Sequence, residues 1–331
     1  MKKILLLFCL LLSTSIVSYT QVNKVGTPSI TVKDMNTAVK FYGEVLGFQK
    51  ISDEELSGAA WEQLKGIFGL HLRVVRMQLG DEQIELTDYL TSGGRSIPED
   101  QRPNDLSFQH IAIVVSDMDK AFQQLRKYNV EFVSTAPQTL PATITPAAGI
   151  KAFYFHDPDS HNLELIYFPK GKGQAKWQQS PEKIFLGIDH TAIGISNTEN
   201  SLQFYQTLLG IERKGESFNY GIEQEHLNNV EGASLHITGL RTAAGPGIEF
   251  LQYLKPGPGK PYPADTRADD LWFWQTTLYV QDIKTLYKKL SANYIIISKN
   301  IISFKEHNGK TFNVFIVKDP DGHAILIRED I

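Results

Sequence analysis

The hydrophobic positions of the chain repeat one pattern in two distant segments. Residues 27–48 and 190–211 each begin with alternating apolar and polar residues and continue with apolar residues at helical spacing. This pattern predicts a short strand, a turn and then a helix in each segment. Gly47 and Gly210 follow the last apolar positions, where a glycine in the left-handed conformation commonly ends a helix.

Two further segments share a second pattern. Residues 108–125 align with residues 273–290 position by position, and both again predict a strand followed by a helix. Each is followed by a strand–turn–strand pattern around an Asp-Pro-Asp sequence, at residues 153–168 and 315–330. Asp and Pro favour a tight turn, because Asp hydrogen-bonds nearby backbone and Pro fixes one dihedral angle.

The four patterns recur at an even interval along the chain. They start at Thr27, His110, His190 and Gln275, which are 83, 80 and 85 residues apart. This period is too long for a solenoid repeat and predicts four βαβββ modules produced by two rounds of duplication.

The connectors between the modules indicate which duplication is the more recent. The first and third connectors both end in Arg-x-x-Asp-Leu, at residues 102–106 and 267–271. We therefore expect a first domain at 21–170, a linker at 171–186 and a second domain at 187–331, with two modules in each domain.

Composition and charge exclude several classes of protein. Of the 331 residues, 42% are hydrophobic and 21% are charged, which is typical of a globular chain with a sizeable core. The net charge of −4 provides neither the basic surface of a nucleic-acid-binding protein nor a polybasic membrane patch. The single cysteine, Cys9, excludes a disulfide framework.

The first 20 residues predict a signal peptide. Lys2 and Lys3 precede a nine-residue apolar run at 4–12, and a polar stretch of small residues leads to Gln21. An uncleaved N-terminal anchor is the alternative, but the run is far shorter than the roughly 20 apolar residues that span a bilayer. We therefore expect an exported protein, periplasmic or secreted, without a membrane segment after cleavage.

The repeated motifs resemble the vicinal oxygen chelate superfamily, which includes glyoxalase I, bleomycin-resistance proteins and extradiol dioxygenases. The resemblance rests on Phe-Tyr-x-x-x-Leu-Gly at 41–47 and 204–210, and on Asp-Pro-Asp-[Ser/Gly]-His at 157–161 and 319–323. It covers essentially the whole chain after the signal. It implies an α+β fold, in which modules pair into two cup-shaped sheets with the helices outside.

The resemblance also implies where a metal would bind. In that family each module offers one ligand from its first strand and one from its last strand. The corresponding first-strand residues are Thr27, His110, His190 and Gln275, and the last-strand residues are Glu85, Glu164, Glu249 and Leu326. Thr27 and Leu326 cannot serve as ordinary ligands. Imidazole and carboxylate together suit Zn, Fe, Ni, Mn or Co and do not choose among them.

The pairing of the modules decides which ligands share a cup, and two arrangements are open. If neighbouring modules pair, one cup contains Glu85, His110 and Glu164, and the other contains His190 and Glu249, with Gln275 as a further oxygen donor. If the two middle modules pair, His110, Glu164, His190 and Glu249 form a complete set. Completeness favours the middle pairing and leaves Glu85 in a decayed outer site.

Each candidate has a structural alternative. Glu85 also fits an outward polar position on an alternating strand, and His190 fits a buried structural histidine. His110 and Glu249 interrupt apolar strands, and a glutamate that faces the core needs a partner to offset the cost of burying its charge. We expect a carboxylate ligand to act as the catalytic base, as either Glu164 or Glu249. His226 is a further catalytic candidate as a proton shuttle, although its segment also fits a solvated loop or short helix.

Three functions are compatible with these residues. The first is a metal-dependent lyase or isomerase of glyoxalase type, which stabilises an enediolate of a small molecule with vicinal oxygens. The second is a non-catalytic binding or sequestering protein. The third is an extradiol-type dioxygenase, but residues 145–154 lack the histidine that such enzymes place there. The expected partner is a small molecule. The sequence is compatible with either a monomer or a homodimer.

Overall fold

A computed structural model describes residues 22–179, 182–305 and 309–331 of the chain. The predicted signal peptide at 1–20 lies outside these residues. None of the described helices has the length and hydrophobicity that a membrane crossing requires.

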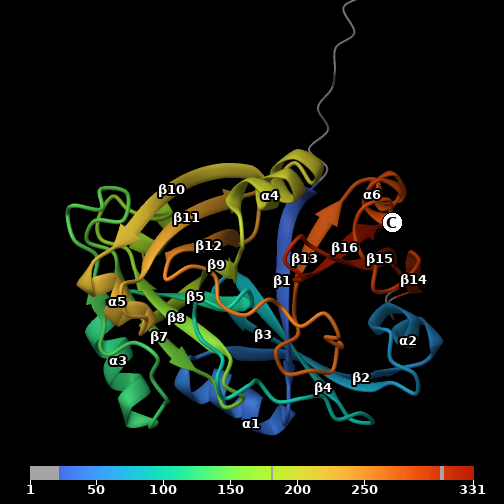
Figure 1. Cartoon of the computed structure of the whole chain (residues 1–331). Helices are drawn as coiled ribbons and strands as arrows, with labels where there is room; N and C mark the ends of the chain where they lie inside the picture. The colour runs from blue at the N-terminus through green and yellow to red at the C-terminus, as the bar shows by residue number, and fades with distance from the viewer. Residues whose placement is uncertain (1–21, 180–181, 306–308) are drawn as a thin grey trace, which may run out of the picture.

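Two curled sheets of eight strands each form the framework, and Figure 1 shows them side by side. In spatial order, the first sheet contains β14 (Ile302–Lys305), β15 (Thr311–Lys318), β16 (Ala324–Asp330), β13 (Trp274–Val280), β1 (Val22–Val32), β4 (Glu82–Tyr89), β3 (His71–Leu79) and β2 (Gln49–Ser57). The second contains β10 (Glu212–Tyr220), β11 (Ser234–Arg241), β12 (Gly247–Lys255), β9 (Phe185–Gly194), β5 (Phe108–Val115), β8 (Asn162–Tyr167), β7 (Lys151–His156) and β6 (Gln138–Thr139).

The strand order establishes how the four modules pair. β5 of the second module lies antiparallel to β9 of the third, and β1 of the first lies antiparallel to β13 of the fourth. Figure 1 shows the blue β1 beside the orange β13. We call the sheet of the second and third modules the middle cup and the sheet of the first and fourth modules the outer cup. The middle pairing is therefore the one that the chain adopts, and each sequence half contributes one module to each sheet.

Short helices complete the modules. They are α1 (Met35–Lys40), α2 (Ala59–Lys65), α3 (Met118–Lys127), α4 (Thr198–Leu202), α5 (Ile222–Asn228) and α6 (Ile283–Ser291). α1 and α4 continue as π-helical turns over Phe41–Val45 and Gln203–Leu208, and a 3₁₀ turn covers Ala175–Gln178.

The first helix of every module begins in the same way. The side chain of Asp34, Asp117, Asn197 or Asp282 accepts a hydrogen bond from the backbone N–H three residues later, at 2.6–3.0 Å. Such a cap satisfies one of the backbone donors that a helix leaves unpaired at its start. Gly47 and Gly210, the predicted stop residues, have φ angles of +75° and +73°, which favour glycine.

The alternation of side chains along β5 separates the helices from the cup. Ile111 and Ile113 point to one face and pack in the main core with Leu125 of α3. His110 and Ala112 point to the opposite, concave face. The first helix of each module thus lies outside the cups, as expected for this α+β fold, whereas α2 and α5 contribute side chains to the cavities of the cups.

The Asp-Pro-Asp turns join each module to its neighbour in sequence. The Tyr42 hydroxyl donates to Asp157 at 3.0 Å, and Asp157 also accepts a hydrogen bond from the His161 ring at 2.8 Å. Tyr205 and Asp319 repeat the first contact at 3.0 Å. His161 therefore acts as a turn residue, as its place after the Asp-Pro-Asp sequence predicted.

The Arg-x-x-Asp-Leu sequences lock the two long connectors together. Asp270 accepts the backbone N–H of Arg267 within its own turn and that of Arg95 from the other connector, at 2.8 and 2.9 Å. Asp105 makes the equivalent pair of contacts with Arg102 and Lys260, at 2.9 and 2.7 Å.

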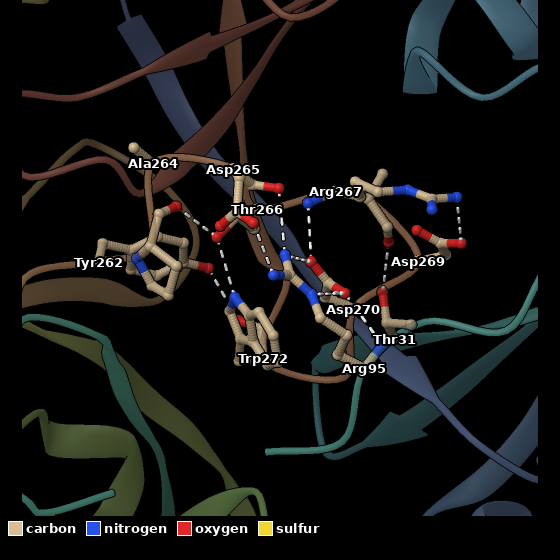
Figure 2. Close-up of polar contacts among 12 residues, drawn as sticks. Thr31, Arg95, Tyr262, Ala264, Asp265, Thr266, Arg267, Asp269, Asp270 and Trp272 are labelled. Atoms are coloured by element: carbon tan, nitrogen blue, oxygen red, sulfur yellow. Dashed lines mark hydrogen bonds and ion pairs between the residues drawn. The ribbon is translucent and has the colours of Figure 1, made fainter. Parts of the chain in front are cut away.

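Figure 2 shows the Asp270 side of this crossing. The Arg95 guanidinium binds Asp270 with two nitrogens and Asp265 with a third, and it lies 4.7 Å from the centre of the Trp272 ring. Bidentate pairs of this kind fix orientation as well as adding energy. The connectors thus hold the middle and outer cups in one arrangement.

Candidate metal centre

Four of the predicted ligands converge at the middle cup. The Nε2 atoms of His110 and His190 are 3.3 Å apart. Oε2 of Glu164 lies 3.1 Å from Nε2 of His110 and 3.6 Å from Nε2 of His190. Oε2 of Glu249 lies 3.5 Å from Nε2 of His190. His110, His190 and Glu249 have the spacing of a group that could hold a metal ion.

The strand registers explain this convergence. In β5 and β8, Ala112 pairs with Glu164, so the glutamate lies opposite the residue two positions after His110. In β9 and β12, Ala192 pairs with Glu249, two positions after His190. Because side chains two positions apart share a face, each parallel pair places one imidazole and one carboxylate on the concave side.

The residue before each histidine orients its ring. The Gln109 side-chain oxygen contacts Nδ1 of His110, and Asp189 accepts a hydrogen bond from Nδ1 of His190 at 3.0 Å. Both residues lie at register shifts between β5 and β9, which are β-bulges that re-aim side chains. With Nδ1 protonated and donating, each ring presents the lone pair of Nε2 to the cluster.

Asp189 is itself held by several donors. Its carboxylate accepts hydrogen bonds from Trp177 at 2.8 Å and from the Arg241 guanidinium at 2.5 Å. Burial disfavours the carboxylate, but the contacts with His190 and Arg241 outweigh burial and hold its pKa well below the usual range.

The charges of the cluster stabilise one another. Burial disfavours the His190 imidazolium, but Glu249 and Asp189 outweigh it and raise the pKa of His190 well above its ordinary value. Burial likewise opposes ionisation of Glu249, and the neighbouring His190 outweighs it, so the pKa of Glu249 is lowered. The centre therefore favours bound positive charge beside ionised carboxylates.

The donor set fits a divalent metal ion. Two Nε2 lone pairs that face each other repel unless a cation or a proton lies between them. Oε2 of Glu164 is buried and has no hydrogen-bond partner among the described residues, so it too is available as a ligand. Two imidazoles with one or two carboxylates are a donor set of Zn²⁺, Fe²⁺ and related ions.

A cavity of about 320 Å³ opens onto this centre. Glu164, His190 and Glu249 line it, together with Tyr154 and Ala152 from β7. The other side of the cavity is formed by side chains of β10, α5, β11 and β12, which all belong to the third module. Two residues that line the cavity have a buried polar atom without a hydrogen-bond partner among the described residues, namely Asn219 Oδ1 and Gln224 Oε1.

The structure does not bring His226 to the cup. Its side chain is exposed on α5, and the cavity is lined instead by Gln224 and Leu227 of the same helix. The seven-residue helix buries the opposite face, so His226 points outward. Of the polar residues of α5, Gln224 lines the cavity.

Glu85 lies in the outer cup, away from His110, although it was a candidate ligand. It occupies the equivalent of Glu249, because Ser29 pairs with Glu85 as Ala192 pairs with Glu249. Thr27, Gln275 and Leu326 occupy the other three ligand positions. Nε of Arg76 donates to the Glu85 carboxylate at 3.1 Å. The arginine thus neutralises the charge of Glu85, as a bound metal ion would neutralise that of Glu249 in the middle cup.

A buried lysine also takes part in the outer cup. Nζ of Lys65, the last residue of α2, donates to the side-chain oxygen of Gln275 at 3.0 Å. Lys65 is only 5% exposed. Burial lowers the pKa of its ammonium to about 8, although the Glu85 carboxylate opposes this change.

Sequence reasoning missed Lys65, Gln109 and Asp189. Lys65 lies one helical turn after Trp61, so its inward direction was readable from helical spacing. Gln109 and Asp189 each precede a candidate histidine directly, a position that an ideal strand turns to the opposite face. Only the bulges bring these two side chains to the imidazoles.

Comparisons with known proteins identify the family and agree with the fold. The glyoxalase/bleomycin resistance protein/dioxygenase superfamily matches residues 21–165 and 187–327. Glyoxalase I of Saccharomyces cerevisiae is 24% identical over 326 residues, which are 90% of this chain and 90% of the relative. A 2-epi-5-epi-valiolone epimerase of Actinomyces sp. is 31% identical over 158 residues, 46% of this chain and 81% of the relative. The crystal structure of glyoxalase I from Zea mays superposes with a TM-score of 0.60 at 14% identity, covering 93% of this chain and 92% of that chain.

Proposed function

Because this chain belongs to the glyoxalase/bleomycin resistance protein/dioxygenase superfamily, we propose that it is a metal-dependent lyase or isomerase. Its substrate class is a small molecule that carries oxygens on neighbouring carbon atoms. The glyoxalase I and epimerase relatives support this class of reaction, since both names describe chemistry on oxygenated small molecules.

One observation carries the proposal. The two histidines use Nδ1 for Gln109 and Asp189, and their Nε2 atoms meet 3.3 Å apart beside two carboxylates. Both Nε2 atoms and the carboxylates of Glu164 and Glu249 thus converge on one point, whereas two structural histidines have no need to share one. A pair of imidazoles fixed in this way is the usual arrangement of metal ligands with outer-shell support.

His110, His190 and Glu249 would hold the metal, and Glu164 would complete the set or act as the base. When bound, the metal polarises a carbonyl oxygen and stabilises the negative charge that develops on it. The Glu164 carboxylate would remove the proton from the adjacent carbon and return it in a second step. Its Oε2 suits this role because it is buried and accepts no hydrogen bond from the described residues.

The wall of the cavity would orient the substrate. Asn219 Oδ1 and Gln224 Oε1 belong to residues that line the cavity, and both are buried acceptors without a partner among the described residues. Such groups lose hydrogen bonds on burial unless a ligand restores them. Hydrogen bonds from substrate hydroxyl groups to these two oxygens would orient the substrate in the cavity beside Glu164.

Proton exchange tests the proposal without knowledge of the natural substrate. Glycolaldehyde, dihydroxyacetone and glyceraldehyde are incubated with the protein in deuterated water, and exchange at carbon is followed by NMR. We expect exchange that needs a stoichiometric metal, disappears in His110→Ala, and is lost in Glu164→Gln with the metal retained. Metal-free protein that binds these compounds without exchange would instead indicate sequestration.

A dioxygenase is the second candidate, because two histidines and one carboxylate also form the triad of non-haem iron oxygenases. The same preparation distinguishes the two functions. Bound iron together with oxygen consumption on addition of a catechol would favour ring cleavage, and exchange without oxygen consumption would favour the isomerase or lyase.

We also propose that the protein is exported after cleavage near Gln21. The basic start and the apolar run at 4–12 support this proposal. Fractionation of the producing cells followed by N-terminal sequencing tests it. A chain that begins before residue 10 and stays with the cytoplasmic fraction would contradict it.

A further inference from the structure

The outer cup contains a cavity of its own. It has a volume of about 180 Å³ and lies over the positions that correspond to the metal ligands of the middle cup. Lys65 lines it beside Glu85 and Gln275. Because Nζ of Lys65 donates to Gln275, the ammonium lies next to two of the former ligand positions.

The two cups differ in the charged residues that line them. The charged residues that line the outer cavity are Lys65, Arg76, Arg328, Glu54 and Glu85, three cations against two carboxylates. The middle cavity has Glu164, Glu216 and Glu249 against Lys214 and Arg241, with His190 in addition. The carboxylates of the middle cup favour a bound cation, whereas lysine and arginine side chains provide the positive charge in the outer cup.

We propose that the outer cup binds a small carboxylate anion without a metal, and that the Lys65 ammonium anchors the anion. The carboxylate would accept hydrogen bonds from Lys65, whose ammonium has three hydrogens and gives one to Gln275. Arg76 binds Glu85 through Nε and adds a second positive charge to the lining of the cavity. A buried ammonium beside a cavity gains a partner for its charge when an anion binds.

The remaining walls set the size and character of the ligand. Leu72, Val74 and Phe312 contribute apolar surface, and Trp61 forms one side. A volume of 180 Å³ is about six times the roughly 30 Å³ that one water molecule occupies in the liquid. This space fits a short aliphatic acid of about five non-hydrogen atoms.

Calorimetric titration of the full chain with propanoate tests the proposal. Propanamide, which has nearly the same shape and no charge, is the matched ligand. We expect propanoate to bind at one site and propanamide to bind at least about tenfold more weakly, as expected for the loss of one charge-assisted hydrogen bond. Equal binding of the two compounds, or binding of neither, would overturn the proposal.

Two variants assign the site. Lys65→Asn introduces the residue that the middle cup has at the equivalent place in α5, Asn228, and should weaken propanoate binding at least about tenfold. Lys40→Asn removes an exposed lysine at the end of α1 and should change nothing. Metal content should be the same in both variants and in the unaltered protein, so failure here leaves the proposal for the middle cup untouched.

NMR on the unaltered protein keeps the test valid if Lys65→Asn does not fold. Propanoate should shift the backbone amide signals of Lys65, Glu85 and Gln275 and leave those of His110 and His190 in place. Shifts confined to the two histidines would show that the anion binds the metal centre, and the proposal for the outer cup would be wrong.

Discussion

The middle and outer cups have the same backbone and opposite chemistry. Equivalent residues pair in the same register in both sheets, so Glu85 stands where Glu249 stands and Leu326 where Glu164 stands. The middle cup gathers two imidazoles and two carboxylates around a place for a cation. In the outer cup, the ammonium of Lys65 lies beside the ligand position Gln275. Glu85, the one glutamate among the four ligand positions there, binds Arg76. Duplication thus preserved a scaffold, and a few side chains decided what each copy can bind.

The largest expected effect comes from the ligands themselves. His110→Ala and His190→Ala should each lower metal affinity by more than the roughly 10–100-fold that outer-shell substitutions cost, because each removes a donor atom outright. Gln275→Ala is the matched change in the outer cup and should leave the metal content as it is. Elemental analysis after dialysis measures both. Metal lost on Gln275→Ala and kept on His110→Ala would reverse the roles of the cups.

Asp189 orients the His190 ring in the middle cup. The outer cup has no equivalent side chain, because the residue before Thr27 is Gly26. Asp189→Asn should weaken metal binding about 10–100-fold, because the Nδ1–H of His190 loses a charged acceptor. Trp177→Phe removes only one donor to Asp189 and is the control, with a smaller loss expected. Competition with a chelator of known affinity gives both values. Unchanged affinity in Asp189→Asn would remove the proposed support for the ring.

Both pairs of neighbouring modules contain the same Tyr–Asp–His contacts. We expect the contribution of these contacts to the unfolding free energy to depend on pH and not on bound metal. Burial disfavours the His161 imidazolium, but Asp157 outweighs it and raises the pKa of His161 above 6.5. This stabilisation is complete below the unfolded pKa of 6.5 and is lost as the pH rises through the raised folded value. Burial of Asp157 is likewise outweighed by His161, so its pKa lies below 3.8, and its contribution is present above 3.8 and lost on acidification.

His161→Gln should therefore cost most between about pH 4 and 6.5, roughly 1–3 kcal/mol of unfolding free energy, and less at pH 9. Urea denaturation across this range measures the difference, and His323→Gln should behave in the same way because the Asp319 pair has the same directions of shift. A cost that grows toward pH 9 would contradict the assigned charges.

The smallest effect is expected for the stability role of Lys65. Lys65→Met removes a charge whose burial is costly but leaves the Gln275 oxygen without its donor, so the two changes largely offset. The unfolding free energy should change by no more than about 1.5 kcal/mol. Thermal and urea denaturation measure this change. A loss of several kcal/mol would mean that Lys65 holds the outer cup together and that its main role is structural.

Much of the fold was predictable from local patterns. The helix starts at Asp34 and Asp117, the stops at Gly47 and Gly210, and the tight turns at 157–161 and 319–323 all follow from short-range rules that tertiary contacts did not override. The equivalence of Glu85, Glu164 and Glu249 was also readable, because it depends on repeated spacing. The outward direction of His226 was not readable, because the helix around it is too short and too polar to reveal its buried face.

The sequence by itself determined four copies of one module and the residue types at eight inward positions, since repetition at an even interval is a property of the chain alone. Only the tertiary structure decided that the second module pairs with the third. That choice depends on long-range contacts between β5 and β9 and on connectors that meet at Asp105 and Asp270. The bulges at Gln109 and Asp189 were likewise fixed only by the pairing, because a register shift exists between two strands and not within one.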